Sequence, residues 1–309
     1  MIDSTDIETA ARRIAGRVRH TPVMRLGPGE LGLPFGVTLK LECLQHAGSF
    51  KPRGAFNRIL SAGAVPASGV IAASGGNHGA AVAYAARALG ITAEIFVPAL
   101  TPQAKRNLIE SFGAKLTLGG PTYAEALAAS RARQVETGAL EIHAYDHPAV
   151  LAGQGTLARE FEADAPELTH VLVATGGGGL IGGISAWYAG RTKVVSVEPE
   201  GCPCLHDALA AGVPVASPVG GVAADALGAR QCGAEMFPVA QLHVSEAVLV
   251  TDDAIRAAQK LVWREFRLVA EPGGATALAA LLSGRWVPPA GAVVGVVMCG
   301  SNADPASVM

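Results

Sequence analysis

The protein has 309 residues and a formal net charge of −2, from 24 Lys and Arg against 26 Asp and Glu. Half of the residues are hydrophobic and 16% are charged, which excludes a disordered or fibrous chain. With no long basic run, the charge argues against a partner that is nucleic acid or an anionic membrane. At roughly 100–200 residues per domain, the length predicts about two domains.

The cysteines and the N-terminus indicate the compartment. Cys43, Cys202, Cys204, Cys232 and Cys299 form no CxxC pair and no zinc-finger spacing. The first residues, MIDSTDIETAARR, lack the basic start and apolar core of a signal peptide. The most apolar stretch, residues 171–188, contains four consecutive glycines, which argue against a spanning helix. We therefore expect a cytoplasmic protein with reduced thiols and no membrane partner.

Apolar runs of strand length alternate with helical patterns along the chain. Thr5 and Glu8 predict a capping box at the first helix. Thr101 and Pro102 predict the N-cap and the first residue of a later helix that ends at residue 112. Strands are expected at residues 37–42, 69–74, 93–98, 115–118, 141–145, 170–175, 193–198 and 293–299. Helices are expected at residues 77–89, 102–112, 123–136, 148–162 and 252–266, and after Gly179. This alternation predicts an α/β fold with parallel sheets and crossover helices, and the pattern over residues 69–145 predicts a small inserted domain.

A run of four glycines follows one predicted strand and precedes a helix. It reads Thr175-Gly-Gly-Gly-Gly-Leu180. Glycines let the backbone approach an anion closely, and successive N–H groups at a helix N-terminus favour phosphate. The run lacks the Gly-Lys-Ser/Thr ending of a nucleotide P-loop, and we interpret it as a cup for a single terminal phosphate. A tight turn alone would need only one glycine.

A second glycine-rich turn, Ser74-Gly-Gly-Asn-His-Gly79, also joins a predicted strand to a helix. Its hydroxyl and free N–H groups suit a carboxylate, although a plain helix cap by Ser74 or Asn77 explains the segment equally well. Lys51 follows a Gly-Ser-Phe turn and precedes an apparent helix. A lysine amine together with a phosphate cup is the minimum for a Schiff base with pyridoxal phosphate.

Together these segments resemble a known family. The segment Lys40-Leu-Glu-Cys-Leu-Gln-His-Ala-Gly-Ser-Phe-Lys-Pro-Arg-Gly-Ala55 is similar to the cofactor-lysine motif of fold-type II pyridoxal-phosphate enzymes. The 74–79 turn, the glycine run, Ala270-Glu-Pro-Gly-Gly-Ala275 and Met298-Cys-Gly-Ser-Asn302 match in order. The resemblance is to the serine/threonine dehydratase and serine racemase branch. It implies a tryptophan synthase β-like fold, with a large domain of residues 1–52 and 147–309 and a small domain of residues 53–146.

The resemblance also implies residue roles. Lys51 would hold pyridoxal 5'-phosphate and later move the Cα proton, with Phe50 against the ring. The phosphate would lie on Gly176, Gly177, Gly178, Gly179 and the Leu180 amide. Asn77 would bond the ring hydroxyl, Glu271 would lie near the ring, and Cys299 would stand beside the pyridine nitrogen. The substrate carboxylate would lie against Ser74, Gly75, Asn77 and His78.

The sequence gives only weak support for a metal site. Glu198 matches an acidic cation ligand of some relatives, but Cys204 stands where those relatives have a second acid. Glu198 is therefore the one candidate metal ligand. The remaining histidines show no ligand spacing.

The expected reaction is dehydrative deamination of L-threonine or L-serine to a 2-oxo acid and ammonia, by a homodimer or homotetramer. The enzyme alternatives are an amino-acid racemase and a dehydratase for hydroxyaspartate or a phenylserine. Elimination is favoured over racemisation because the racemase pattern has a serine where this chain has Gly75. An alternative of another class is a non-catalytic cofactor- or amino-acid-binding protein, which the intact Lys51 argues against. A nicotinamide-dependent dehydrogenase would need GxGxxG after its first strand, and no such motif follows the first predicted strand of this chain, residues 37–42.

Overall fold

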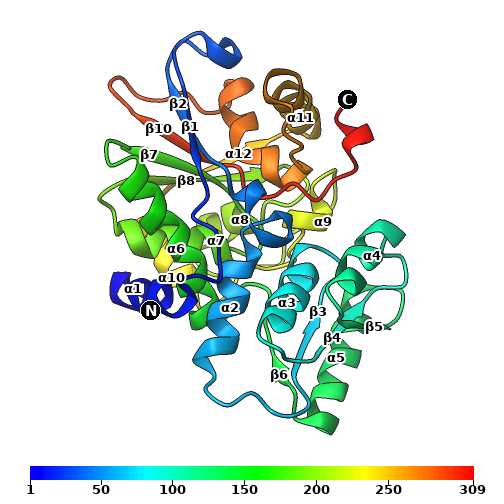
Figure 1. Cartoon of the computed structure of the whole chain (residues 1–309). Helices are drawn as coiled ribbons and strands as arrows, with labels where there is room; N and C mark the ends of the chain where they lie inside the picture. The colour runs from blue at the N-terminus through cyan, green and yellow to red at the C-terminus, as the bar shows by residue number, and fades with distance from the viewer.

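Two β-sheets organise the chain, and the computed structural model describes all of its residues, 1–309 (Figure 1). The larger sheet has the strand order β1-β2-β10-β7-β8-β9. Its strands are β1 (Val23–Leu26), β2 (Val37–Lys40), β7 (His170–Ala174), β8 (Lys193–Pro199), β9 (Val244–Val250) and β10 (Val294–Val297). All pairings are parallel except the edge pair β1–β2. The carboxyl ends of the five parallel strands therefore face the same edge.

The smaller sheet lies within residues 70–141 and has the order β5-β4-β3-β6. Its strands are β3 (Val70–Ala73), β4 (Ala93–Val97), β5 (Lys115–Leu118) and β6 (Leu140–Glu141), and all pair in parallel. Parallel neighbours need crossover connections, which helices provide here. The parallel sheets flanked by helices predicted from the sequence are confirmed.

Helices cover both faces of the large sheet. In Figure 1, α1, α6, α7 and α10 lie below it, while α11 and α12 lie to its right. The helices of this unit are α1 (Ser4–Ile14), α6 (Pro148–Asp164), α7 (Gly179–Tyr188), α8 (Cys204–Ala211), α9 (Ala224–Leu227), α10 (Phe237–His243), α11 (Asp252–Phe266) and α12 (Pro272–Leu282). Around the small sheet are α3 (Asn77–Ala88), α4 (Gln103–Ser111) and α5 (Tyr123–Thr137), and α2 (Lys51–Ser61) contacts both α3 and α6. None of these helices is both long and apolar enough to cross a bilayer.

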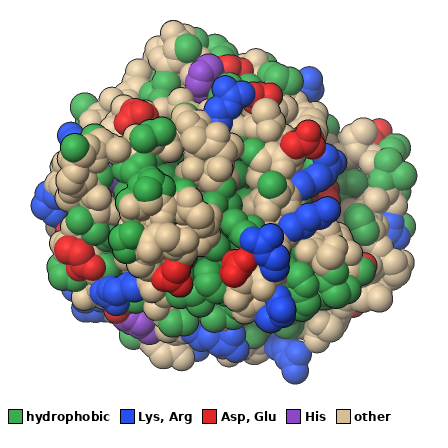
Figure 2. Space-filling view, turned by 90° about the horizontal axis from the view of Figure 1, so that it is seen from above, with side chains coloured by type: hydrophobic (Ala, Val, Ile, Leu, Met, Phe, Trp, Pro, Cys, Tyr) green, Lys and Arg blue, Asp and Glu red, His purple; other side chains and the backbone are tan.

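The apolar core follows the two sheets. A cluster of 56 buried residues surrounds the large sheet, and one of 17 surrounds the small sheet. Continuous apolar strands such as Val294–Val297 are buried on both faces, as parallel strands between helix layers must be. Figure 2 shows acidic and basic side chains interspersed on the face seen from above, consistent with the small net charge.

Three local predictions were wrong. The capping box of α1 uses Asp3 and Asp6 rather than Thr5 and Glu8, because the Asp3 carboxylate already accepts the first free N–H groups. The N-cap residue of α4 is Pro102, since the N–H of Thr101 closes a turn on Pro98.

The strand expected at residues 141–145 is also shorter than predicted. After β6, the backbone N–H groups of Tyr145 and Asp146 both donate to Nδ1 of His143, which turns the chain away from the sheet. The edge strands β1 and β9 had no clear pattern in the sequence and were missed.

Candidate active site

The glycine run lies at the carboxyl end of β7, where it opens α7. The backbone N–H groups of residues 176–180 donate no hydrogen bond within the protein, while the next bonded amide of this helix, Gly182, reaches the carbonyl of Gly178 at 2.8 Å. Five consecutive donors at a helix N-terminus, with the positive end of the helix dipole behind them, form a site for an anion.

Glycine is required here by close packing. A Cβ atom on Gly177 would lie 2.5 Å from the aromatic ring of Tyr145, and one on Gly176 would lie 2.8 Å from the carbonyl oxygen of Leu227. Gly178 has φ +93°, in the left-handed region that favours glycine. Tyr145 therefore supports the turn, and no pattern in the sequence pointed to it.

The loop at residues 233–235 holds the turn from its other side. The N–H of Gly233 donates to the carbonyl of Gly177 at 3.0 Å. The Asp146 carboxylate accepts the N–H groups of Ala234 and Glu235 at 3.0 and 2.9 Å. A charged acceptor fixes this loop, so Asp146 positions the glycine turn indirectly.

Lys51 is the first residue of α2, and its amine points toward the start of the 144–146 turn. Nζ donates to the carbonyl oxygen of Ala144 at 3.0 Å and lies 5.0 Å from the centroid of the Phe50 ring. Burial lowers the pKa of Lys51 to about 8, although the neighbouring Cys299 and Glu271 act in the opposite direction. A buried amine with a depressed pKa is a ready nucleophile and base near neutral pH.

The end of β10 fixes the turn that carries Lys51. The N–H of Phe50 donates to the carbonyl of Cys299 at 3.1 Å, and Ser49 pairs with Gly300 in a short antiparallel bridge. The Cys299 thiol lies 3.4 Å from the carbonyl oxygen of Gly273. Burial, followed by the charge of Glu271, raises the pKa of Cys299 above its ordinary value, so the thiol stays neutral.

Asn77 joins the two sheet units. Its side-chain amide donates to the Glu271 carboxylate, and its amide oxygen accepts from Nδ2 of Asn302 at 2.7 Å. Burial raises the pKa of Glu271 to about 7, against the lowering effect of the Asn77 bond. Asn302 also donates to the carbonyl of Ala47 at 2.8 Å. It therefore connects the Lys51 segment to Asn77, a role that the sequence motif did not reveal.

The 74–79 turn presents a second group of free donors. The N–H of Gly76 donates to Oγ of Ser74 at 3.2 Å, whereas the N–H groups of Gly75 and residues 77–79 have no partner in the protein. Nε2 of His78 lies 2.8 Å from the carbonyl oxygen of Ile142, which can only accept, so this nitrogen carries the proton. Burial and then the charge of Lys51 lower the pKa of His78 to about 3, so its ring is neutral. The two anion-favouring turns thus lie beside one buried amine.

Comparison with known proteins identifies the family. The model of the family described as "Pyridoxal-phosphate dependent enzyme" matches residues 14–300. The chain belongs to this family. The resemblance seen in the sequence is confirmed, and the cofactor of the family is pyridoxal phosphate.

Individual relatives support the same placement. This chain is 37% identical to "L-threonine ammonia-lyase" of Geobacter sulfurreducens, over 98% of this chain and 76% of that protein. It is 35% identical to "Phenylserine dehydratase" of Ralstonia pickettii, over 99% and 94% of the two chains. The structure of serine racemase from maize superposes with a TM-score of 0.92 at 32% identity, covering 98% of this chain and 94% of that one. The chain spans about half the length of some other curated relatives that it matches.

The residues present fit the family's cofactor. The unpartnered N–H groups of residues 176–180 suit a terminal phosphate, and the buried Lys51 amine suits an aldehyde. The Phe50 ring beside Nζ and the neutral Cys299 thiol supply an apolar wall and a weak hydrogen-bond partner.

Glu198 has a structural environment in this member of the family. Its carboxylate accepts the N–H groups of Leu205 and His206 at 2.6 and 2.8 Å, at the start of α8. Burial raises the pKa of Glu198 to about 8, and these two bonds act against that rise. No group of three or more His, Cys, Asp or Glu side chains is arranged to hold a metal ion.

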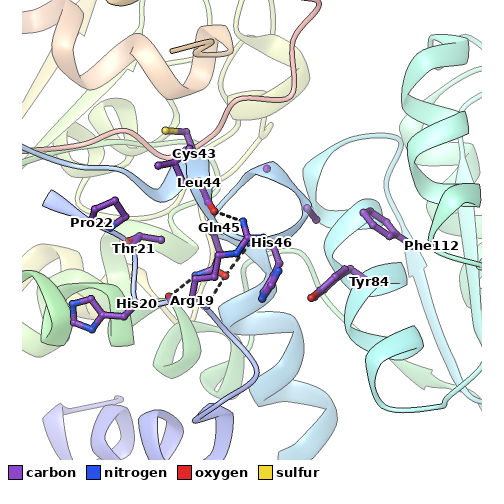
Figure 3. A pocket seen from close by; sticks show the side chains of 12 residues that line it. Arg19, His20, Thr21, Pro22, Cys43, Leu44, Gln45, His46, Tyr84 and Phe112 are labelled. Carbon is purple, nitrogen blue, oxygen red and sulfur yellow. Dashed lines mark hydrogen bonds between the residues drawn. The ribbon is translucent and has the colours of Figure 1, made fainter. Parts of the chain in front are cut away.

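A surface pocket of about 740 Å³ is lined by residues 19–22 and 43–48 together with Tyr84 and Phe112 (Figure 3). The rings of His46 and Tyr84 stack in it with centroids 4.7 Å apart. Neither Lys51 nor the glycine turn lines this pocket. Asn302, which bonds Ala47 and packs on Gly48, lies between the pocket and Asn77.

Proposed function

We propose that the protein catalyses the dehydrative deamination of L-threonine or L-serine to a 2-oxo acid and ammonia. The observation that carries the proposal is the buried, low-pKa amine of Lys51 beside five unpartnered N–H groups at one helix N-terminus. The similarity to an L-threonine ammonia-lyase over nearly the whole chain supports the choice of substrate. The reaction balances, because the water lost from Cα and Cβ is regained when the product hydrolyses and releases ammonia.

We assign the phosphate to the turn of residues 176–179 and the Leu180 amide. A phosphate dianion there would accept from the five N–H groups and gain from the dipole of α7. Lys51 would hold the cofactor, Phe50 would pack on its ring, and Asn77 would bond its ring hydroxyl. Glu271, bonded to Asn77, would lie beside the ring. Pyridoxal phosphate, when bound, supplies the electron sink that stabilises negative charge at Cα.

Lys51 would also move the proton. Its amine, once freed by the substrate's own amine, would remove the proton from Cα, and the depressed pKa increases the fraction of neutral amine near neutral pH. Cys299 beside the pyridine nitrogen offers a neutral thiol and no carboxylate. A neutral pyridine stabilises a carbanion less, which favours prompt loss of the β-hydroxyl over return of the proton to Cα.

The substrate's carboxylate is assigned to the 74–79 turn. The free N–H groups of Gly75, Asn77 and His78 at the N-terminus of α3 favour a negative charge. The Ser74 hydroxyl lies at the same turn, where it accepts the N–H of Gly76.

A second function, racemisation, is favoured by the superposition on maize serine racemase. Hydroxyaspartate and phenylserine are the substrate alternatives, the latter supported by similarity to a phenylserine dehydratase. A difference of one methylene-sized group in the substrate changes discrimination by only about 1–3 kcal/mol, so the shape of the pocket decides among these substrates.

An assay for 2-oxo acids tests the proposal. The purified holoenzyme is incubated with L-threonine, L-serine, phenylserine and hydroxyaspartate, with the Lys51→Ala variant as control. We expect the highest kcat/KM with L-threonine or L-serine, and no formation of 2-oxo acid by the Lys51→Ala variant. A 2-oxo acid from phenylserine or hydroxyaspartate alone would replace the assigned substrate, and no 2-oxo acid from any of them would contradict elimination.

We further propose two domains, residues 53–146 and the remainder, and a cytoplasmic homodimer or homotetramer. Separate apolar clusters around the two sheets support the division, and five free, buried cysteines are in keeping with a reducing compartment. Light scattering after size exclusion measures the oligomer, and a monomer would contradict it.

A further inference from the structure

Gly75 and Thr101 occupy the same space at the substrate turn. Gly75 lies between β3 and α3, and Thr101 follows β4. A Cβ atom on Gly75 would overlap the hydroxyl oxygen of Thr101 and lie 2.8 Å from its Cγ2. The Thr101 side chain therefore stands where a side chain of residue 75 would be.

The backbone of Thr101 is fixed, but its hydroxyl is free. The N–H of Thr101 donates to the carbonyl of Pro98 at 3.0 Å, and its carbonyl accepts from Nε of Arg106 at 2.8 Å. The hydroxyl makes no hydrogen bond within the protein, and the residue is half-buried. A β-branched side chain has few χ1 rotamers, so few positions are open to the hydroxyl.

The surroundings place Thr101 beside the proposed carboxylate site. The neighbouring N–H groups of Gly75, Asn77 and His78 are unpartnered. The helix after Thr101, α4, reaches across to α9, where Nζ of Lys105 lies 2.7 Å from Oδ2 of Asp225. The two turns follow neighbouring parallel strands, β3 and β4, so Thr101 lies at the same edge of the small sheet as Asn77, which bonds Glu271 of the other sheet unit.

We propose that the Thr101 hydroxyl donates a hydrogen bond to the α-carboxylate of the amino-acid substrate and so completes the site begun by the 74–79 turn. This inference rests on the proposed function. A carboxylate only accepts hydrogen bonds and therefore needs donors. The Thr101 hydroxyl supplies a side-chain donor, which Gly75 lacks because it has no side chain. A hydrogen bond to a charged group is worth roughly a 10- to 100-fold change in affinity.

The first experiment uses the holoenzyme and L-alanine, which keeps the carboxylate and has no β-hydroxyl to lose. Thr101→Val removes the hydroxyl at nearly constant volume, and Thr101→Ser keeps it. We expect the Kd for L-alanine, from the change in cofactor absorbance, to rise about 10- to 100-fold in the valine variant and to stay within about 3-fold in the serine variant. Cofactor content and the spectrum without substrate should not change.

A second pair of variants moves the hydroxyl. Thr101→Ala should weaken binding, and adding Gly75→Ser should recover at least tenfold because the new hydroxyl enters the vacated space. Gly75→Ser alone should be impaired, since its Cβ meets Thr101.

The outcomes separate this inference from the proposed function. If the wild type forms no 2-oxo acid but binds L-alanine in a Thr101-dependent way, the proposed function fails and the carboxylate contact stands. Unchanged L-alanine binding in Thr101→Val, with the cofactor in place, would overturn it. Weaker binding of L-threonine with unchanged L-alanine binding would also overturn it, by assigning the hydroxyl to the β-position.

Discussion

The Lys51 side-chain nitrogen lies 3.0 Å from the carbonyl oxygen of Ala144, 93 residues further along the chain. This bond holds the amine beside the turn that carries Tyr145, on which the glycine run packs. The amine is buried, and the cost of burying its charge exceeds the stabilising effect of Cys299 and Glu271, so its pKa falls to about 8.

The rate at which the apoenzyme captures pyridoxal phosphate should follow this pKa. Only the neutral amine is a nucleophile, so the rate, divided by that of a simple amine with an ordinary pKa, should be highest near pH 7 and fall as pH rises above about 8. Stopped-flow absorbance over pH 6–10 measures it. A ratio that is flat across this range would mean that Lys51 titrates as an ordinary lysine.

Reduction with borohydride should attach the cofactor to Lys51. The basis is the fit between its buried amine and the unpartnered donors of residues 176–180. Peptide mapping by mass spectrometry identifies the labelled lysine. A label on another lysine would disprove the assignment, and so would a protein that binds no cofactor after purification and reconstitution.

Gly177→Asp should weaken cofactor binding at least tenfold more than Gly177→Ala. Both variants place a Cβ 2.5 Å from the Tyr145 ring and share the resulting packing strain, but only Asp adds a negative charge next to the phosphate. Cofactor titration of the folded apoenzymes compares them. Gly220→Ala is the control and should leave cofactor affinity unchanged, because its added Cβ would meet no atom within 4 Å. Equal affinities for Asp and Ala would show that this turn does not hold the phosphate.

From L-serine in deuterated buffer, the enzyme should form pyruvate faster than it forms D-serine. Racemisation needs a proton donor on each face of Cα. Gly75 has no side chain for the second face, and the Thr101 hydroxyl that fills this space is assigned to the substrate carboxylate. The neutral Cys299 beside the ring nitrogen favours elimination as well. Coupled pyruvate detection and chiral chromatography follow both products. Faster D-serine formation would identify the protein as a racemase.

Arg53→Met should lower the free energy of unfolding of the apoenzyme by about 3–5 kcal/mol. Arg53 is fully buried and binds Glu42 through Nε and Nη2 at 2.8 and 2.7 Å, and Glu160 at 2.7 Å. Its removal leaves Glu42 without a cationic partner and Glu160 with Lys40 alone, at 3.3 Å. Arg53→Lys keeps the charge without the fork geometry and should lose less. Urea unfolding measures both, with the exposed Arg256→Met as control, and equal stability of Arg53→Met and wild type would contradict this role.

The sequence by itself determined the elements whose signals are local. Continuous apolar strands such as Val294–Val297 and the glycine run before α7 could be placed because periodicity and backbone freedom act within a few residues. Lys51 was chosen because its own motif combines a turn, an amine and a helix start. The edge strands β1 and β9 and the length of β6 were not determined, since strand edges depend on pairing partners far away in the chain.

Tertiary structure alone decided how these local pieces support one another. The contacts of Tyr145 with Gly177, of Asn302 with Asn77 and of Asp146 with the 233–235 loop join residues that lie far apart in the chain, and no local pattern predicted these contacts. The same holds for Thr101, whose side chain fills the space beside Gly75 because two parallel strands end side by side. The pKa of Lys51 was likewise outside the reach of the sequence, because it depends on the burial and charges that only the folded chain brings together.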